Sequence, residues 1–189
     1  MDKIKKYIDQ STKAKKTLIK SEKKIFSVVD LITKAIKKGG KIMLCGNGGS
    51  AADAQHLAAE FLIRLRPTVK RRPFPAITLA QDTSTLTACG NDFNFEDQFS
   101  RCLQALGKKN DVLIAISTSG NSKNIIKVLK EAEKMSILSV GFLGNGGGKA
   151  KKLCNFPIIV GSKNVARIQE SHIFLGHYIF ELVENQLIK

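Results

Sequence analysis

Five short apolar runs, separated by segments of helical periodicity, constrain most strongly what this chain can fold into. The runs are rich in β-branched residues and are bounded by turn residues, which is typical of strands buried on both faces. They cover residues 41–45, 76–80, 111–117, 138–143 and 156–160. Strands that alternate with helices form parallel sheets with helices on both sides. We therefore predict the α/β class, with a three-layer sandwich around a five-stranded parallel sheet.

The first 38 residues carry a different pattern. Lysines alternate there with apolar residues at near-helical spacing, and Gly39 and Gly40 end the pattern. We expect one domain over residues 1–189, in which residues 1–38 form a long helical extension. Ile4, Ile8 and Leu18 lie on this amphipathic region and need a partner to cover them. The extension is therefore predicted to contact another subunit.

The positive charge of the chain is large, but its distribution matters more than its size. Lys and Arg number 31 against 16 Asp and Glu, which gives a net charge of +15 and raises nucleic acid or an anionic substrate as a partner. Much of the excess lies between Lys3 and Lys41, and aromatic residues make up only 6% of the chain. This pattern favours a solvated helix face, so nucleic-acid binding is not expected.

The sequence contains no recognisable membrane-spanning segment or signal peptide. No apolar run approaches the roughly 20 residues that cross a bilayer, so no membrane contact is expected. The first residues lack the apolar segment of a signal peptide. Cysteines stand singly, without the spacing of metal fingers or redox motifs. We therefore predict a cytoplasmic protein.

The turn after the third apolar run is rich in hydroxyl groups. Ser117, Thr118, Ser119 and Ser122 stand between that run and a helical pattern. Such a turn offers an anion several backbone N–H groups and the positive end of the helix dipole, and the hydroxyls add donors. An ordinary helix N-cap explains one hydroxyl but not four. We interpret this serine turn as a phosphate-binding site.

Two glycine-rich turns invite other interpretations. The turn at 46–51 has the G-x-G-x-x-A spacing of a dinucleotide fingerprint, but the basic segment 64–67 stands where that fold needs an acidic residue. The turn at 144–150 is not a P-loop, because Leu143 replaces the first glycine of the motif and Ala150 its hydroxyl residue. Both turns follow predicted strands, where parallel sheets bind their ligands.

Polar side chains on two predicted helices offer catalytic chemistry. His56 and Glu60 are four residues apart after the first glycine-rich turn, so they share one helix face and could hold a metal together. Taken alone, such a pair is more often a packed polar contact. Gln169 and His177 lie beside the apolar surface of the last helix, and the sequence leaves open whether they are functional. His172 is interpreted as a surface histidine.

These segments resemble the sugar isomerase (SIS) domain family and, within it, isomerases of heptose phosphates, from about residue 41 to the C-terminus. The resemblance rests on residues 46–56, on Asn91 and Asp92, on residues 116–122, and on residues 166–170 followed by His177. It implies the SIS fold and a homotetramer with active sites at subunit contacts. The alternative is a non-catalytic SIS module that binds a phosphosugar and regulates a protein partner.

The resemblance also implies a reaction. A reversible aldose–ketose isomerisation would convert D-sedoheptulose 7-phosphate to D-glycero-D-manno-heptose 7-phosphate through an enediolate. This is the first step toward the ADP- or GDP-activated heptose of bacterial lipopolysaccharide or capsule. Moving a carbonyl between C1 and C2 needs a base for the carbon-bound proton and an acid for the hydroxyl proton. We assign Glu60 as the base and His177 as the acid.

The resemblance implies the remaining site residues as well. The phosphate would be held by Ser117, Thr118, Ser119 and Ser122. The sugar would be contacted by Asn47, Gly48, Gly49, Ser50, Glu60, Asn91, Asp92 and Gln169. One zinc ion per subunit would be held by His56, Glu60, Gln169 and His177.

The spacing of two of these ligands raises a geometric problem. Gln169 and His177 are eight residues apart, which is about 12 Å along a helix axis. Side chains so far apart converge poorly on one metal ion. We therefore predict that the helix begins close to Gln169, or that the two ligands of one site come from neighbouring subunits.

Overall fold

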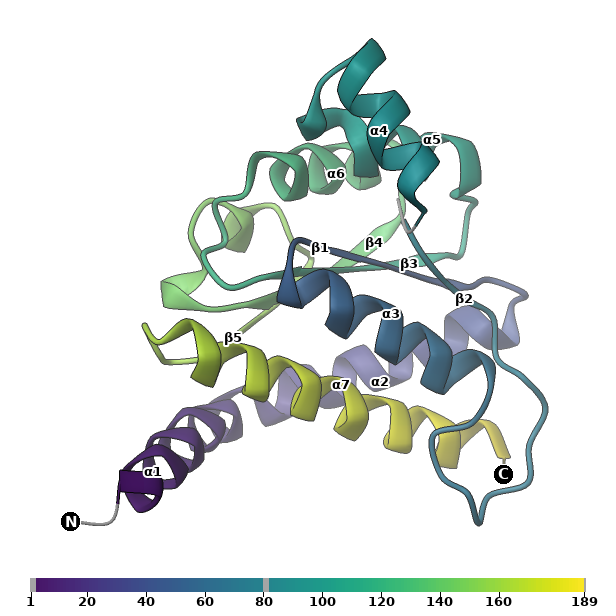
Figure 1. Cartoon of the computed structure of the whole chain (residues 1–189). Helices are drawn as coiled ribbons and strands as arrows, with labels where there is room; N and C mark the ends of the chain where they lie inside the picture. The colour runs from purple at the N-terminus through teal and green to yellow at the C-terminus, as the bar shows by residue number, and fades with distance from the viewer. Residues whose placement is uncertain (1–2, 80–81, 189) are drawn as a thin grey trace.

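The computed structural model describes residues 3–79 and 82–188 of the chain (Figure 1). In chain order, its α-helices are α1 (Lys3–Lys16), α2 (Glu22–Lys37), α3 (Gly49–Leu62), α4 (Thr83–Asp92), α5 (Gln98–Leu106), α6 (Lys123–Lys134) and α7 (Val165–Ile188). The strands are β1 (Ile42–Gly46), β2 (Ala76–Thr78), β3 (Val112–Ser117), β4 (Leu138–Leu143) and β5 (Phe156–Ile159). Short 3-10 turns are η1 (Thr17–Ser21), η2 (Phe95–Asp97), η3 (Asn145–Gly147) and η4 (Ala150–Lys152).

The five strands form one parallel sheet in the order β2-β1-β3-β4-β5. Its central strand, β3, is buried along its whole length, as its unbroken apolar sequence requires. All five predicted strands are confirmed, with shifts of one or two residues at their ends. The last residue of the second predicted strand, Ala80, lies outside the described residues.

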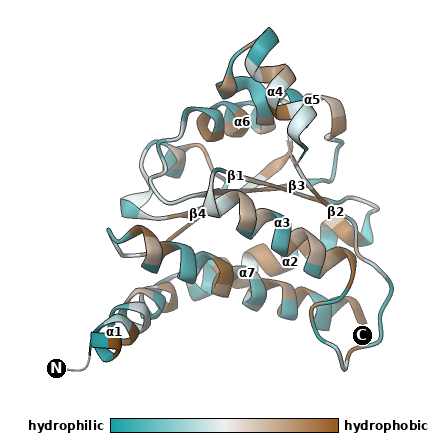
Figure 2. Cartoon of the chain, viewed as in Figure 1, coloured by the Kyte–Doolittle hydropathy of each residue, from teal (hydrophilic) through white to brown (hydrophobic). Residues whose placement is uncertain are grey.

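Helices cover both faces of the sheet, so the three-layer prediction is also confirmed. Alternate residues of β3 enter two separate cores: Ile114 packs with α2, α3 and α7, whereas Leu113 and Ala115 pack with α5 and α6. Figure 1 shows α3 and α7 below the sheet and α5 and α6 above it. The apolar colour in Figure 2 is concentrated in the strands and on the inward sides of these helices.

The N-terminal extension is helical, as predicted, but a 3-10 turn interrupts it at Thr17–Ser21. The Gly161 N–H donates to Thr17 Oγ1 at 2.9 Å and ties this interruption to the end of β5. Leu18 is only 4% exposed because it packs into the chain's own core, so the expectation that it needs another subunit was wrong. Ile4 and Ile8 on α1 are 67% and 56% exposed, so these two apolar side chains are not covered by the rest of the chain.

Membrane insertion through a helix finds no support in the described part of the chain. None of its helices combines the length and apolarity needed to cross a bilayer.

Candidate active site

The serine turn joins β3 to α6 at the carboxyl edge of the sheet, which confirms the predicted strand–turn–helix arrangement. Ser117 Oγ accepts a hydrogen bond from the Gly120 N–H at 3.0 Å. Ser119 Oγ accepts one from the Asn121 N–H at 3.1 Å. Because α6 begins directly after Ser122, its first N–H groups lie beside the turn and have no backbone carbonyl partner within the helix. The turn therefore has the donor geometry of an anion site.

The second glycine-rich turn supports the serine turn from behind. The Lys149 N–H donates to Asn121 Oδ1 at 3.0 Å, and the Ala150 N–H donates to the Gly120 carbonyl at 2.9 Å. Gly120 has φ +65°, and a Cβ there would overlap the Gly147 carbonyl, so a glycine is required. The turn at 144–150 is therefore a wall of the serine turn rather than a P-loop.

The first glycine-rich turn lies on the neighbouring strand, because β1 and β3 are paired. It exposes Gly48 and Gly49, while the Ser50 side chain is buried at 3% exposure. The Asn47 carbonyl accepts a bond from the Ser50 N–H at 3.0 Å. Gln169 on α7 lies directly against Gly49, since a Cβ on that glycine would overlap the Gln169 amide. Four residues predicted to contact sugar, together with Gln169, are thus gathered at this turn.

His56, Glu60 and His177 form a second group, which we call the His–Glu–His cluster. Helices α3 and α7 lie side by side and run in the same direction (Figure 1), with Gly176 packed directly against Leu57. This close approach places His56 Nε2 at 2.9 Å from His177 Nε2 and 3.5 Å from Glu60 Oε1. One donor atom from each residue lies within 4.8 Å of the others.

The cluster fits a tetrahedral metal ion. Metal–nitrogen and metal–oxygen distances of about 2.1 Å put neighbouring ligand atoms of a tetrahedral site about 3.4 Å apart, a value that lies between the two distances observed. Burial, followed by the charge of His56, lowers the pKa of His177. A lowered pKa keeps this imidazole neutral at neutral pH, the form in which its nitrogen can bind a metal. Two imidazoles and a carboxylate are an ordinary donor set for zinc.

Gln169 does not belong to this cluster within one chain. Helix α7 begins at Val165 and continues through both Gln169 and His177, so these residues stay about 12 Å apart along the axis. Gln169 instead lies at Gly49, seven residues before His56 on the parallel helix. A helix end therefore does not bring the two predicted ligands together. Only the second alternative, ligands from neighbouring subunits, remains open.

Asn91 and Asp92 are also separated from the other predicted site residues. They end α4, where both are exposed and Asn91 Nδ2 donates to Asp92 Oδ1 at 2.7 Å. Figure 1 shows α4 at the top of the molecule, on the opposite side of the sheet from α3 and α7. A single chain therefore joins the serine turn to the first glycine-rich turn, whereas the cluster lies further along α3 and this pair lies on the other side of the sheet.

Sequence reasoning missed Arg71, which lies in the basic loop before β2. Its guanidinium forms an ion pair with the buried Glu184 of α7, and its Nη2 donates to the Glu60 carbonyl at 2.8 Å. The loop is thereby fastened to both helices that carry the cluster. A lone acidic residue on the apolar face of the last helix was the available signal, because a buried carboxylate needs a cation.

The interpretation of His172 as a surface residue was wrong. Its side chain is fully buried beside Phe142, with 6.3 Å between the ring centroids. Burial lowers the pKa of His172 to about 4, and the nearby Leu143 carbonyl offsets only part of this effect. His172 is therefore a neutral core residue rather than a candidate ligand.

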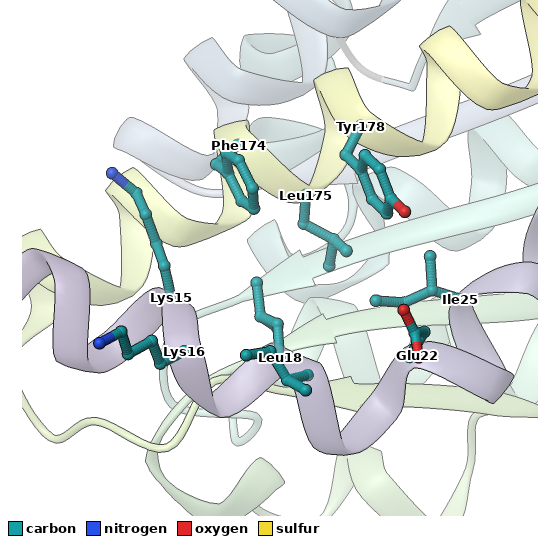
Figure 3. Close-up of a pocket in the computed structure, with 9 residues that line it drawn as sticks. Lys15, Lys16, Leu18, Glu22, Ile25, Phe174, Leu175 and Tyr178 are labelled. Atoms are coloured by element: carbon teal, nitrogen blue, oxygen red, sulfur yellow. The ribbon is translucent and has the colours of Figure 1, made fainter.

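A further hollow lies on the helical side of the molecule, away from the carboxyl edge of the sheet. It has a volume of about 300 Å³, and Figure 3 shows Leu18 and Ile25 facing Phe174, Leu175 and Tyr178 of α7. The hollow is mainly apolar, although Lys15, Lys16 and Glu22 also line it, and it contains none of the residues predicted to bind the sugar phosphate.

Comparisons with known proteins cover nearly the whole chain. A sequence model of the SIS domain family matches residues 6–144. The phosphoheptose isomerase of Clostridium acetobutylicum is 46% identical over 97% of this chain and 94% of its own length. That of Aneurinibacillus thermoaerophilus is 47% identical over 100% of this chain and 96% of its own.

Solved structures agree with the sequence comparisons. A phosphoheptose isomerase from Neisseria gonorrhoeae superposes with a TM-score of 0.89 at 36% identity, covering 97% of this chain and 98% of that one. One from Francisella tularensis gives 0.91 at 32% identity, covering 97% of both. The chain therefore belongs to the SIS domain family and, within it, to the phosphoheptose isomerases.

Proposed function

We propose that this chain interconverts D-sedoheptulose 7-phosphate and D-glycero-D-manno-heptose 7-phosphate, the entry step to activated heptose for bacterial surface glycans. One observation carries the proposal. In a chain similar to phosphoheptose isomerases over nearly its full length, an anion-binding turn and a His–Glu–His cluster are both present. Because sugar phosphates are held inside the cell, the proposal places the enzyme in the cytoplasm.

The serine turn binds the phosphate in this proposal. Ser117, Thr118, Ser119 and Ser122 supply hydroxyls, and the start of α6 supplies backbone donors and the positive end of its dipole. The sugar lies along the first glycine-rich turn, where Asn47, Gly48, Gly49 and Ser50 contact its hydroxyls. Exposed glycines suit this role because the substrate can approach the backbone closely.

Glu60 and His177 carry out the proton transfers. The Glu60 carboxylate removes the proton from the carbon next to the carbonyl and returns it to the neighbouring carbon. His177 is the proposed acid for the sugar oxygens. Its lowered pKa keeps the imidazole neutral, so with Nε2 on the metal its other nitrogen, Nδ1, would carry the proton that it gives to one sugar oxygen and regains from the other. General acid and base catalysis of this kind contributes about 100- to 10,000-fold each.

Zinc is the proposed metal, held by His56, Glu60 and His177. When bound, it supplies a Lewis acid that stabilises negative charge on the enediolate oxygens. Glu60 has to divide its two oxygens between the metal and the carbon-bound proton, because a carboxylate bound through both oxygens is a weak base. Oε1, the oxygen beside His56, is assigned to the metal.

A homotetramer completes the site in this proposal. Gln169 contacts the metal cluster of a neighbouring subunit, and Asn91 and Asp92 contact the substrate of a neighbouring subunit, because all three lie away from the cluster of their own chain. The exposed apolar residues of α1, Ile4 and Ile8, supply part of the subunit contact.

Incubation of the purified chain with D-sedoheptulose 7-phosphate, with and without a chelator, tests the activity. Formation of the aldose phosphate, lost with the chelator and restored by zinc, is the expected result. Tight binding of the sugar phosphate without turnover would instead support the non-catalytic regulator, which no observed feature favours.

Mixing two variants tests the shared site. His177→Ala and Gln169→Ala are each expected to be nearly inactive alone. If one subunit supplies His177 and its neighbour supplies Gln169, randomly mixed oligomers regain about a quarter of the sites in wild-type form. Mixed oligomers with no recovered activity would show that both residues act in the same subunit.

A further inference from the structure

Two asparagine side chains connect the turns that face the proposed substrate. Asn47 follows β1, and Asn124 lies in the first turn of α6, directly after the serine turn. Asn47 Nδ2 donates to Asn124 Oδ1 at 2.9 Å, and Asn124 Nδ2 donates to Asn47 Oδ1 at 2.8 Å. Asn124 is only 2% exposed, whereas Asn47 is half-buried and lies at the substrate side.

A backbone group fixes the orientation of both amides. The Ile125 N–H donates to Asn124 Oδ1 at 2.9 Å. Because an N–H can only donate, the oxygen of Asn124 has to face it, and the Nδ2 of Asn124 then has to face Asn47. An oxygen of Asn47 is therefore required opposite that Nδ2. One backbone amide of α6 thus sets which end of the Asn47 amide donates and which accepts.

The pair also fixes the spacing between two loops that are far apart in the chain. Asn47 and Asn124 are 77 positions apart, and their double hydrogen bond crosses between the ends of β1 and β3. A buried amide that loses its partner bears the full cost of desolvation. The two turns are therefore held at one separation by a contact that tolerates little change.

We propose that Asn124 is a positioning residue for the isomerisation: it orients the Asn47 amide toward the sugar and holds the sugar-binding turn at a fixed distance from the serine turn. This inference rests on the proposed function, in which Asn47 contacts the sugar. Asn124 acts only through Asn47, so its loss affects the sugar end of the substrate and spares the phosphate end.

The test is Asn124→Asp, measured on the assembled enzyme. Aspartate keeps an oxygen for the Ile125 N–H and for Asn47 Nδ2, but it has no donor for Asn47 Oδ1. The KM for sedoheptulose 7-phosphate is expected to rise about tenfold, the factor for one unpaired buried acceptor, with kcat changed much less. Inhibition by inorganic phosphate, which occupies only the serine turn, is measured in Asn124→Ser, which adds no charge beside that turn, and is expected to stay within twofold of wild type.

The matched control is Asn155→Asp, since Asn155 Oδ1 also accepts a backbone N–H, from Ser139, but lies before β5. It is expected to keep the wild-type KM. If Asn124→Asp does not fold, Asn124→Ser removes the same donor and is expected to raise KM similarly. In an Asn47→Ala background, either change should have no further effect on KM.

Some outcomes would overturn the inference. An unchanged KM in both Asn124 variants would show that the pair is only structural. Equal weakening of sugar and inorganic phosphate in Asn124→Ser would place Asn124 in the serine turn instead. These results are separable from failure of the proposed function, because that failure would show as a wild-type enzyme without turnover.

Discussion

The serine turn and the His–Glu–His cluster illustrate two ways of building half of a site. The serine turn takes its functional groups from residues 117–122, and its shape comes from bonds such as Gly120 N–H to Ser117 Oγ. The cluster joins His56 to His177 across 121 positions, through the packing of two helices. The serine turn is a local structure, whereas the cluster depends on tertiary and, in our proposal, quaternary contacts.

The strongest test of this division is Glu60→Gln. Removal of the base is expected to lower kcat by about 100- to 10,000-fold, while inhibition by inorganic phosphate stays unchanged because the serine turn is separate. Steady-state kinetics with both ligands measures this. Glu133→Gln, an exposed glutamate on α6, is the control and should retain full activity. Near-wild-type turnover in Glu60→Gln would remove the cluster from the chemistry.

Acid should weaken the helix packing on which the cluster depends. The pKa of His172 is about 4 in the folded chain and about 6.5 in the unfolded chain. The unfolded state therefore binds more protons between these values, and stability is lost as pH falls from about 6.5 to about 4, by up to about 3 kcal/mol. Chemical denaturation across this range measures the loss.

His172→Leu removes the titrating group while keeping a buried side chain of similar size. Its stability should depend less on pH between 4 and 6.5 than that of the wild type. An identical pH dependence in both proteins would assign the acid sensitivity to other groups.

Metal loading should stabilise the cluster but not the serine turn. Zinc at 100 times its Kd is expected to raise the free energy of unfolding by about 2.7 kcal/mol, seen as a higher Tm. His56→Ala should abolish this rise, whereas Thr118→Val should keep it. A zinc-dependent rise that survives in His56→Ala would place the metal elsewhere.

Thr118→Val is expected to have the smallest effect of these changes, and it tests the serine turn. The substitution keeps the shape of the side chain and removes one hydroxyl donor. The KM for the substrate and the inhibition constant of phosphate should rise together, about fivefold, with kcat unchanged. Thr87→Val, on the exposed side of α4, is the control. A lowered kcat would mean that the two halves are coupled.

The local features of this chain are largely predictable from its sequence. The apolar runs give all five strands because strands buried on both faces need continuous apolar sequence. The serine turn can be recognised in the sequence because its hydroxyl residues lie within the short segment 117–122. Strand β1 ends at Gly46 rather than at the predicted residue 45, because its pairing with β3 continues as far as the pair of Gly46 and Ile116.

Features that depend on distant contacts were not predictable to the same degree. His172 looks like any polar residue on a helix, and only the packing of α7 on β4 shows that it is buried. Leu18 looked like an interface residue because the 3-10 turn that directs it inward is fixed by Gly161, far along the chain. Arg71 and Asn124 escaped notice because their partners, Glu184 and Asn47, lie 113 and 77 positions away.

The contact between Gly176 and Leu57 has a consequence for the shape of the His–Glu–His cluster. The separation of the two imidazoles depends on how closely the backbones of α3 and α7 approach, not on the ligands themselves. A methyl group at position 176 would overlap the end of the Leu57 side chain, so Leu57 or the helices would have to move. Any such movement changes the distance between the two imidazole nitrogens, which is 2.9 Å in this chain. The geometry of the cluster is therefore set in part by a glycine that belongs to none of its three residues.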